Sequence, residues 1–336
     1  MVRPLGIGRF HSERQRRYLM AMLNKRSYNI SPNYKKYGGI RPIETSEGVK
    51  TRYPITSDKC TTFFDGSGDV IAQYYNEDGK TFKLPNLAPT KQRENIYSKE
   101  SMTHPAKMYT PLTQELIQNY SKEGDTILDP MCGIGTVNIE SSRLGRNSIG
   151  VDYEKRFVNE SKKNAELLEK SGQKIGEVKI MHGDARKLSN IKKVDTIVTS
   201  PPFADVQPFH DKKFKIKGRM VGKGGSGQNY SSKADNIGNL NQKSYLTEMQ
   251  KVYASCYSVL KPNGTMVIHM KNPIKNQKIV PLDKLTIKNA ESVGFKLKER
   301  KKRHLDNVSF WTRNYRKKYP QAEKIEHEDI LVFKKK

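Results

Sequence analysis

Cysteine is scarce in this sequence of 336 residues, and long apolar runs are missing. The three cysteines, Cys60, Cys132 and Cys256, lie far apart and form no CxxC pair. This pattern argues against a disulfide framework and a zinc site and is typical of a reducing compartment. No apolar stretch approaches membrane-spanning length, and the amino terminus lacks the apolar core of a secretory signal. We therefore expect a cytoplasmic protein with no metal centre and no membrane span.

Acidic residues are also few, since 35 Asp and Glu stand against 62 Lys and Arg, which gives a formal net charge of +27. A surplus of this size destabilises a compact protein by self-repulsion, so a polyanionic partner is expected, and nucleic acid is the usual one. A solvated surface in a generally basic proteome is the alternative. The charge leaves the oligomeric state open.

The first hundred residues differ in pattern from the rest. They are rich in proline, tyrosine and arginine and have few apolar stretches. A short helix is expected at residues 12–25. A strand at 69–76 lies between two Asp-Gly turn signals, which together predict a small β-meander. We interpret residues 1–100 as a basic N-terminal extension.

From residue 101 to residue 336, short apolar runs alternate with amphipathic stretches. Strands are expected at residues 126–128, 148–151, 178–181, 195–198, 265–269 and 329–333, and helices at 136–144, 154–170, 245–260 and 283–293. This alternation predicts an α/β domain with a doubly wound, mostly parallel sheet covered by helices on both faces. Ligands of such sheets bind beyond the carboxyl ends of the strands, so functional residues are expected there.

A long segment without periodicity, residues 204–243, follows the fourth strand. It holds six glycines, eight basic residues and three acidic residues. Because ordinary connections in α/β units are much shorter, we expect a functional loop, with a solvated linker as the alternative.

The sharpest motif joins the first strand of this domain to its first helix: Asp129-Pro130-Met131-Cys132-Gly133-Ile134-Gly135-Thr136. Its two glycines let the backbone turn tightly and approach a ligand closely. The helix that follows points its free amides at a polar or anionic part of that ligand. Asn138 stands where a dinucleotide fingerprint needs a third small residue, and the Lys and Ser/Thr of a Walker loop do not follow Gly135. NAD and ATP are therefore disfavoured.

Acidic residues close the next two strands. Asp152 follows the second strand, where a carboxylate can hold both hydroxyls of a ribose. Asp184 follows the third strand, where a side chain can reach the amino group of an adenine. Each acid alone is a common helix N-cap. In series, the three strand ends match an amino acid, a ribose and an adenine, which is the outline of S-adenosylmethionine.

The fourth strand ends at a double proline, in the run Thr199-Ser200-Pro201-Pro202-Phe203. Proline cannot donate a hydrogen bond to a sheet, so the strand must end there and leave its carbonyls facing the cleft. Ser200 offers a hydroxyl acceptor and Phe203 a flat face. These suit a base whose amine is held by acceptors and whose flipped ring rests on an aromatic shelf. A structural turn is the alternative.

Together these motifs resemble a known family. Residues 129–136 are similar to motif I of class I methyltransferases, in the DPxxGxGT form of amino-methylating DNA enzymes. Residues 199–203 resemble their TSPPY/F catalytic motif, in the form associated with cytosine N4. Residues 104–108 with Leu112, residues 260–264 and residues 328–334 are similar to further segments of that family. The resemblance covers residues 101–336 and implies a Rossmann-like domain of the DNA methylase N-4/N-6 family.

The resemblance also implies roles for individual residues. The implied cofactor-binding residues are Asp129, Pro130, Cys132, Gly133, Gly135, Thr136, Asp152 and Asp184. The implied catalytic residues, which would hold the target base, are Ser200, Pro201, Pro202 and Phe203. The amine attacks the methyl group directly, so no covalent enzyme intermediate is needed. Cys132 is then no nucleophile, and the Pro-Cys motif of cytosine C5 enzymes is missing.

The leading interpretation is a methyltransferase that acts on N4 of cytosine in DNA. Motif I precedes the TSPP motif, the reverse of the order in many cytosine-N4 enzymes, and no large target-recognition domain is obvious. An RNA cytidine-N4 enzyme acting on ribosomal or transfer RNA is the nearest alternative. Adenine-N6 methylation, a non-catalytic nucleic-acid-binding protein on the same fold and a small-molecule enzyme follow.

Three basic regions are candidates for contact with phosphates: the N-terminal arm, the loop at 204–243 and the run at 296–303. We expect the contacts to come mainly from the first two. The residues named for this role are Lys212, Lys213, Lys215, Lys217, Arg14, Arg16 and Arg17.

Overall fold

The computed structural model describes residues 43–45, 48–50, 60–68, 70–75, 84, 87–104, 107–202, 214–216, 219–221, 231, 233–305 and 315–336. The helix expected at residues 12–25 lies outside these ranges. A seven-stranded sheet forms the centre, with the strand order β14-β15-β11-β8-β5-β6-β7. Its strands are β5 (Thr126–Asp129), β6 (Asn147–Asp152), β7 (Val178–His182), β8 (Val194–Thr199), β11 (Leu260–Met270), β14 (Phe295–His304) and β15 (His327–Lys335).

The pairing of the strands confirms the predicted fold class. Strands β7, β6, β5, β8 and β11 run parallel to one another. Strand β15 is antiparallel to both of its neighbours, β11 and β14. All six strands predicted for residues 101–336 are present in this sheet. The domain is therefore α/β, doubly wound and mostly parallel.

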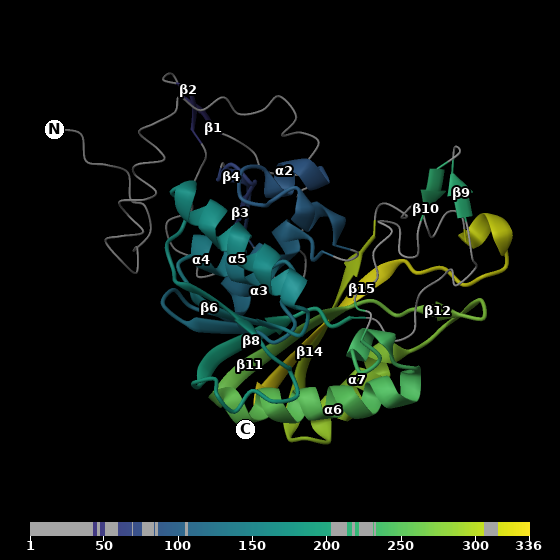
Figure 1. The fold of residues 1–336 in the computed structure, drawn as a ribbon. Coiled ribbons are helices and arrows are strands. Elements are labelled where there is room, and N and C mark those ends of the chain that lie inside the picture. The colour runs from purple at the N-terminus through teal and green to yellow at the C-terminus, as the bar shows by residue number, and fades with distance from the viewer. Residues whose placement is uncertain are drawn as a thin grey trace.

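Five helices cover the two faces of the sheet (Figure 1). They are α3 (Thr110–Tyr120), α4 (Thr136–Arg143), α5 (Lys155–Lys170), α6 (Gln242–Val259) and α7 (Leu282–Glu291). Alternate residues of each central strand point to opposite faces, so Ile127 packs with α3 while Leu128 packs in the cluster that includes α6 and α7. Both side chains are fully buried. This two-sided burial explains why the central strands read as short continuous apolar runs.

The remaining elements are short. They are β1 (Ile43–Thr45), β2 (Gly48–Lys50), β3 (Cys60–Phe64), β4 (Val70–Tyr75), α2 (Pro89–Arg93), η2 (Glu100–Thr103), β9 (Phe214–Ile216), β10 (Arg219–Val221), η3 (Ile237–Asn239), β12 (Ile274–Lys275) and β13 (Lys278–Ile279). The strand predicted at residues 69–76 is β4, which pairs with β3 in a two-stranded antiparallel hairpin. Among the described residues, no helix is long and apolar enough to cross a membrane.

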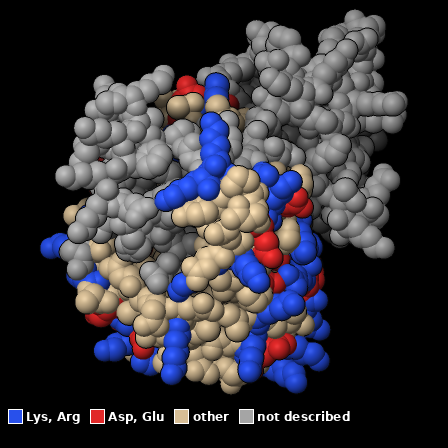
Figure 2. Space-filling model, turned by 90° about the vertical axis from the view of Figure 1, so that its right-hand side faces the viewer, with Lys and Arg blue, Asp and Glu red and all other residues tan. Residues whose placement is uncertain are grey.

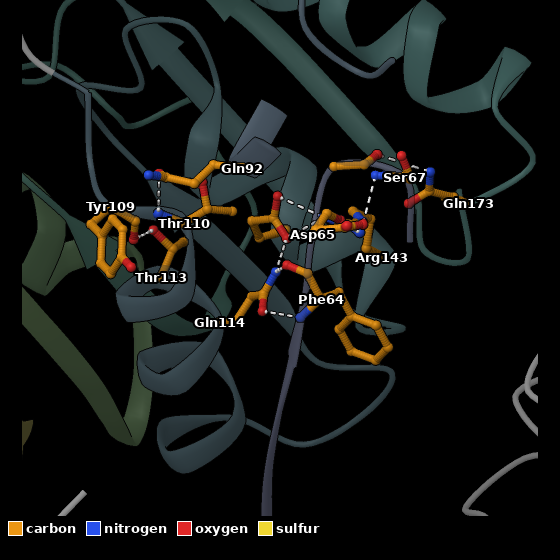
Figure 3. A network of polar contacts seen from close by, with 12 residues as sticks. Phe64, Asp65, Ser67, Gln92, Tyr109, Thr110, Thr113, Gln114, Arg143 and Gln173 are labelled. Atoms are coloured by element: carbon orange, nitrogen blue, oxygen red, sulfur yellow. Dashed lines mark hydrogen bonds and ion pairs between the residues drawn. The ribbon is translucent and has the colours of Figure 1, made fainter. Parts of the chain in front are cut away.

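The end of β3 and the turn that follows it pack directly on the helices of the large sheet (Figure 3). The side-chain amide of Gln114 on α3 accepts a hydrogen bond from the backbone N–H of Phe64 at 2.7 Å and donates to its carbonyl at 2.9 Å. The buried guanidinium of Arg143 on α4 donates to the carbonyl of Asp65. Further on, Ile96 is fully buried against α4 and α5. The proposed division at residue 100 therefore crosses a continuous set of buried contacts.

Two longer elements of the domain, α3 and β14, have no counterpart among the expected ones. Helix α3 was not predicted, although it buries Leu112 and Leu116 completely. The sequence of edge strand β14 indicates only a basic run, because just two of its residues, Phe295 and Leu297, are apolar. Two of its basic side chains are held by acids of neighbouring elements: Arg300 contacts Asp283 and Asp329, and Arg303 contacts Glu328. Tertiary ion pairs of this kind leave no periodic signal in the sequence.

Candidate active site

A cleft of about 380 Å³ opens at the carboxyl ends of the parallel strands. It lies where the class of fold places ligands. Most residues that the sequence assigns to the site line this cleft: Asp129, Pro130, Cys132, Gly133, Thr136, Asp152, Asp184, Ser200, Pro201 and Pro202. The structure thus brings the two motifs, 70 residues apart in the chain, to the walls of one cavity.

The loop between β5 and α4 depends on its two glycines. Gly133 has φ 52° and Gly135 has φ 81°, a left-handed region that favours glycine. A Cβ added to Gly135 would lie 2.8 Å from the hydroxyl oxygen of Ser161 on α5. Gly135 also caps α4 without a side-chain hydrogen bond. The first-turn amides of α4 therefore remain available to a polar ligand.

Asp152, at the end of β6, holds this loop by accepting a backbone hydrogen bond from it. Its Oδ2 accepts the backbone N–H of Gly133 at 2.8 Å, and its Oδ1 accepts that of Glu154 at 2.9 Å. Burial raises the pKa of the Asp152 carboxyl to about 6. Each carboxylate oxygen can accept a second hydrogen bond, so the group can still take the hydroxyls of a ribose.

Asp129, at the end of β5, joins the loop to the neighbouring strand. Its Oδ1 accepts the hydroxyl of Thr199 at 2.8 Å and the backbone N–H of Met131 at 3.1 Å. Burial raises the pKa of the Asp129 carboxyl to about 7. This carboxyl therefore fixes the cofactor loop against the strand that carries Ser200.

Asp184, after β7, faces the cleft but is already paired. The Nε of Arg186 donates to both of its oxygens at 2.9 Å, and Arg186 also donates to Glu248 on α6 at 2.7 Å. Burial alone would raise the pKa of Asp184, but the hydrogen bonds and charge of Arg186 lower it. A contact with an adenine amino group would have to use the remaining lone pairs of this carboxylate.

Tyr153 also lines the cleft, and sequence reasoning missed it. Its hydroxyl donates to Asp235 at 2.6 Å, and the ammonium of Lys233 lies 4.2 Å from the centre of its ring. Both partners come from the described last part of the long loop, which begins at residue 233. The sequence does indicate this position, because Tyr153 directly follows Asp152 at the end of a predicted strand.

The thiol of Cys132 is buried in the loop. Burial raises the pKa of the thiol well above its ordinary value. A protonated, buried thiol is a poor nucleophile. The chemistry of the cleft therefore depends on other groups.

Ser200 lies at the end of β8, opposite the cofactor loop. Its hydroxyl oxygen is 3.3 Å from Nδ1 of His269 on β11, and Nε2 of His269 is 3.1 Å from Oε2 of Glu328 on β15. His269 and Glu328 line the same cleft. Neither was singled out as a site residue from the sequence, although both lie at ends of predicted strands.

Several predicted site residues lie outside the described part of the chain. They are Phe203, Lys212, Lys213, Lys217, Arg14, Arg16 and Arg17. Lys215 lies in β9, of which the backbone alone is described. Within the described ranges, no group of His, Cys, Asp and Glu side chains is arranged to hold a metal ion.

The chain belongs to the DNA methylase family, whose model matches residues 19–163 and 194–336. A second model, Conserved hypothetical protein 95, matches residues 113–221. The first match covers both motifs of the cleft and also most of the first hundred residues.

Two of the relatives that the chain resembles are methyltransferases. The chain is 32% identical over 183 residues to the tRNA (guanine(10)-N2)-dimethyltransferase of Methanocaldococcus jannaschii, with 50% of this chain and 46% of that protein covered. It is 34% identical over 101 residues to the type II methyltransferase M2.DpnII of Streptococcus pneumoniae, with 28% of this chain and 36% of that protein covered. The chain thus spans less than half the length of either relative.

Among solved structures, TrmN of Thermus thermophilus aligns with a TM-score of 0.44 and 16% identity, covering 71% of this chain and 53% of that chain.

Proposed function

We propose that this protein is an S-adenosylmethionine-dependent methyltransferase that modifies an exocyclic amino group of a nucleic-acid base. The observation that carries the proposal is the meeting of two motifs in one cleft. The loop residues from Asp129 to Gly133 and Asp152 line this cleft, together with Ser200 and Pro201. A methyl donor held by the loop and a base amine held at Ser200 would lie side by side.

The donor half of the cleft has the groups that S-adenosylmethionine needs. The amides of α4 suit its methionine carboxylate, and the carboxylate of Asp152 suits its ribose hydroxyls. The cofactor supplies a methyl group on a sulfonium. The residues of this chain hold it, exclude water and present the second substrate.

The acceptor half suits an amine rather than a carbon or an oxygen nucleophile. An amine on an aromatic ring is a poor nucleophile while its lone pair is delocalised into the ring. Acceptors that bind its two hydrogens, here the Ser200 hydroxyl and a backbone carbonyl at the prolines, favour a lone pair directed at the methyl group. The aromatic ring of Phe203 would then stack on the base.

The high net charge supports nucleic acid as the substrate. Figure 2 shows Lys and Arg side chains spread over the described part of one face, with few acidic side chains among them. A surface of this sign attracts phosphates at long range. It disfavours a small neutral substrate.

N4 of cytosine in DNA is the first target to test, because the TSPP motif has the form associated with that reaction. A second candidate is an amine of an RNA base, and the relative from Methanocaldococcus jannaschii favours it, since it covers half of this chain. Both candidates use the same donor site and the same Ser200 contact.

Isotope transfer followed by mass spectrometry of nucleosides tests the proposal. The purified protein is incubated with S-adenosylmethionine carrying a deuterated methyl group, and with genomic DNA or total RNA in separate reactions. We expect labelled N4-methylcytosine from the DNA. Label on a base of the RNA alone would replace the first target by the second, and label in neither would overturn the proposal.

Two variants connect the activity to the acceptor half of the cleft. Ser200→Ala should lower the single-turnover rate about 10- to 100-fold while cofactor affinity persists, because the lost acceptor acts on the base. Phe203→Ala should mainly weaken substrate binding, by about 1–3 kcal/mol. A wild-type rate in Ser200→Ala would remove Ser200 from the reaction.

A further inference from the structure

Four adjacent strands each contribute one residue to a chain of polar contacts that begins at Ser200. The hydroxyl of Ser200 on the end of β8 is 3.3 Å from Nδ1 of His269, and Nε2 of His269 is 3.1 Å from Glu328. Arg303 on β14 donates to the same oxygen of Glu328 at 2.7 Å. The strand register produces this order, since Ile268 pairs with Thr199 and Arg303 pairs with Glu328.

The contacts are sheltered from water. The side chain of His269 is 10% exposed, and that of Glu328 is 15% exposed. Burial by itself would raise the pKa of Glu328, but the hydrogen bond from His269 and the charges of Arg303 and Lys271 lower it. Glu328 is therefore ionised at neutral pH and acts as a hydrogen-bond acceptor alone.

A fixed acceptor at Nε2 determines the tautomer of a neutral His269. Because Nε2 must carry the hydrogen that Glu328 accepts, Nδ1 has a free lone pair. The hydroxyl of Ser200 then donates its hydrogen to Nδ1, and both lone pairs of its oxygen are left for the cleft. A protonated His269 would instead donate to Ser200 from Nδ1 and leave the hydroxyl hydrogen pointing into the cleft.

We propose that His269, oriented by Glu328, is a positioning residue that makes Ser200 the acceptor of a proton from the substrate amine. The proposal rests on the proposed function, because it assigns an amine to the acceptor half of the cleft. Neutral His269 is the competent state, and Arg303 keeps Glu328 in place.

The proton transfers balance the methyl transfer. The amine nitrogen forms a bond to the methyl carbon with its lone pair, and the bond from that carbon to sulfur breaks with its electrons going to sulfur. The amine then gives one proton to the Ser200 oxygen, and Ser200 gives its own proton to Nδ1 of His269. The ring becomes an imidazolium beside the carboxylate of Glu328, and the proton later passes to water.

Glu328 on β15 contacts His269 directly, and Arg303 on β14 contacts Glu328. Other charged or titratable groups that line the same cleft are Lys271, directly after β11, and His104, Lys107, Asp129, Asp152, Glu154, Asp184, Arg186 and Asp235. Two of these carboxyls titrate near neutrality, since the pKa of Asp129 is about 7 and that of Asp152 is about 6. A test of His269 must therefore separate its contribution from theirs.

Single-turnover methylation of genomic DNA, measured across pH 5.5 to 8.5, makes this separation. The wild-type rate should rise as the pH increases from 5.5, so that its pH profile has an acid limb. His269→Phe removes the acceptor and should lower the rate about 100-fold, in the range of lost general base catalysis. His269→Asn keeps an acceptor near the position of Nδ1 but cannot take the proton. The rate of His269→Asn should lie between the rates of the wild type and of His269→Phe, and its pH profile should lack the acid limb.

His327→Asn is the matched control, because His327 precedes Glu328 on β15 but does not line the cleft. It should keep the wild-type rate and pH profile. Calorimetry with S-adenosylmethionine should show the same affinity in all of these variants, which excludes unfolding as the cause. An acid limb that persists in His269→Asn would overturn the proposal and assign the limb to the carboxyls of Asp129 and Asp152, whose pKa values are about 7 and about 6.

A second readout does not depend on methylation. Nitrogen chemical shifts of the ring, recorded with ¹⁵N-labelled histidine at pH 8.5 on the cofactor-free protein, report which nitrogen carries the hydrogen. The signal of His269 is assigned by its loss in His269→Asn. We expect hydrogen on Nε2 in the wild type and a mixture in Glu328→Gln. Hydrogen on Nδ1 in the wild type would overturn the proposal, whereas a protein that labels neither DNA nor RNA would overturn the proposed function instead.

Discussion

The hydroxyl of Thr199 donates a hydrogen bond to Oδ1 of Asp129 at 2.8 Å, and both side chains are buried. Asp129 begins the cofactor loop, and Thr199 immediately precedes Ser200. One hydrogen bond between adjacent parallel strands therefore sets the distance between the two halves of the cleft. Errors in this distance are costly, because methyl transfer requires the two reacting atoms in close alignment.

Thr199→Val tests the importance of this bond. The shape is preserved, but a buried acceptor loses its donor, which should lower the free energy of unfolding by about 1–3 kcal/mol. Thr196→Val is a matched control, since the Thr196 hydroxyl is also buried on β8 and donates to the carbonyl of Tyr120 at 2.9 Å. Both variants should lose similar stability in urea titrations, but Thr199→Val alone should weaken S-adenosylmethionine binding. Equal affinities for S-adenosylmethionine in the two variants would show that the hydrogen bond between Thr199 and Asp129 does not affect the cofactor site.

Asp129→Asn should change how stability depends on pH. The pKa of the Asp129 carboxyl is about 7 in the folded protein, compared with an ordinary value of 3.8 that applies to the unfolded chain. The folded protein therefore binds the carboxyl proton more tightly than the unfolded chain does. Stability from this group is therefore present at low pH and is lost as pH rises from about 4 to about 7. At 1.4 kcal/mol per pKa unit, the loss is on the order of 4 kcal/mol.

The amide of Asn can accept from Thr199 and Met131 without becoming charged. Urea titrations at pH 4.5 and pH 8 should therefore show a smaller drop for Asp129→Asn than for the wild type. Parallel profiles for the two proteins would indicate that the Asp129 carboxyl is already ionised at low pH in the folded state.

The sequence contains most of the information that defines the sheet. Central strands such as β5 and β8 are buried on both faces, so short apolar runs mark them, and the glycine loop marks the first turn. Edge strand β14 escapes this reasoning because Arg300 and Arg303 are satisfied by acids that lie elsewhere in the sequence. Its character as a strand is decided by the pairing with β15.

The residues of the candidate site also differ in whether the sequence alone can identify them. Asp129, Asp152 and Ser200 could be found because each belongs to a motif at a strand end. His269 and Glu328 could not be ranked, because a single histidine or glutamate has no spacing that distinguishes it. Their significance arises from three-dimensional neighbours on β8, β11 and β15. The pairing of Asp184 with Arg186 likewise depends on side-chain geometry that the sequence does not contain.

Asp152→Ala should weaken S-adenosylmethionine binding about 10- to 100-fold without unfolding the protein, because hydrogen bonds to a charged group contribute about 1.5–3 kcal/mol. Asp195→Ala is a matched control: Asp195 also accepts a backbone N–H, from Thr126 at 2.9 Å, but does not line the cleft. Calorimetry at pH 7.5 measures both. Because the pKa of Asp152 is raised to about 6, wild-type affinity should also fall when the pH drops below 6. An unchanged affinity in a folded Asp152→Ala protein would remove Asp152 from the cofactor site.

The last prediction concerns the long loop that follows the catalytic strand. The four lysines Lys212, Lys213, Lys215 and Lys217 begin ten residues beyond Pro202, which lines the cleft. Chain connectivity therefore places them within reach of a substrate held at Ser200. We expect them to neutralise phosphates, so that binding of nucleic acid falls steeply as salt rises.

Replacement of these four lysines with Gln should flatten the plot of log affinity against log salt by up to about four units, or 0.7 to 0.9 per lost contact. The matched control replaces four exposed lysines on α5 and α7, namely Lys162, Lys170, Lys284 and Lys288, which removes the same charge away from the cleft. Fluorescence anisotropy with a labelled DNA duplex and a labelled RNA hairpin measures the slopes.

Deletion of residues 1–26 should flatten the slope as well, and more for the folded RNA than for the duplex, because a folded RNA offers phosphates in several directions. Cofactor affinity should stay unchanged in each case, since none of the altered residues belongs to the motifs assigned to the cofactor. If the loop variant and the control variant flatten the slope equally, the effect comes from net charge alone, and the loop lysines make no specific contact. A slope that neither the loop replacement nor the deletion changes would mean that both basic regions face away from the substrate.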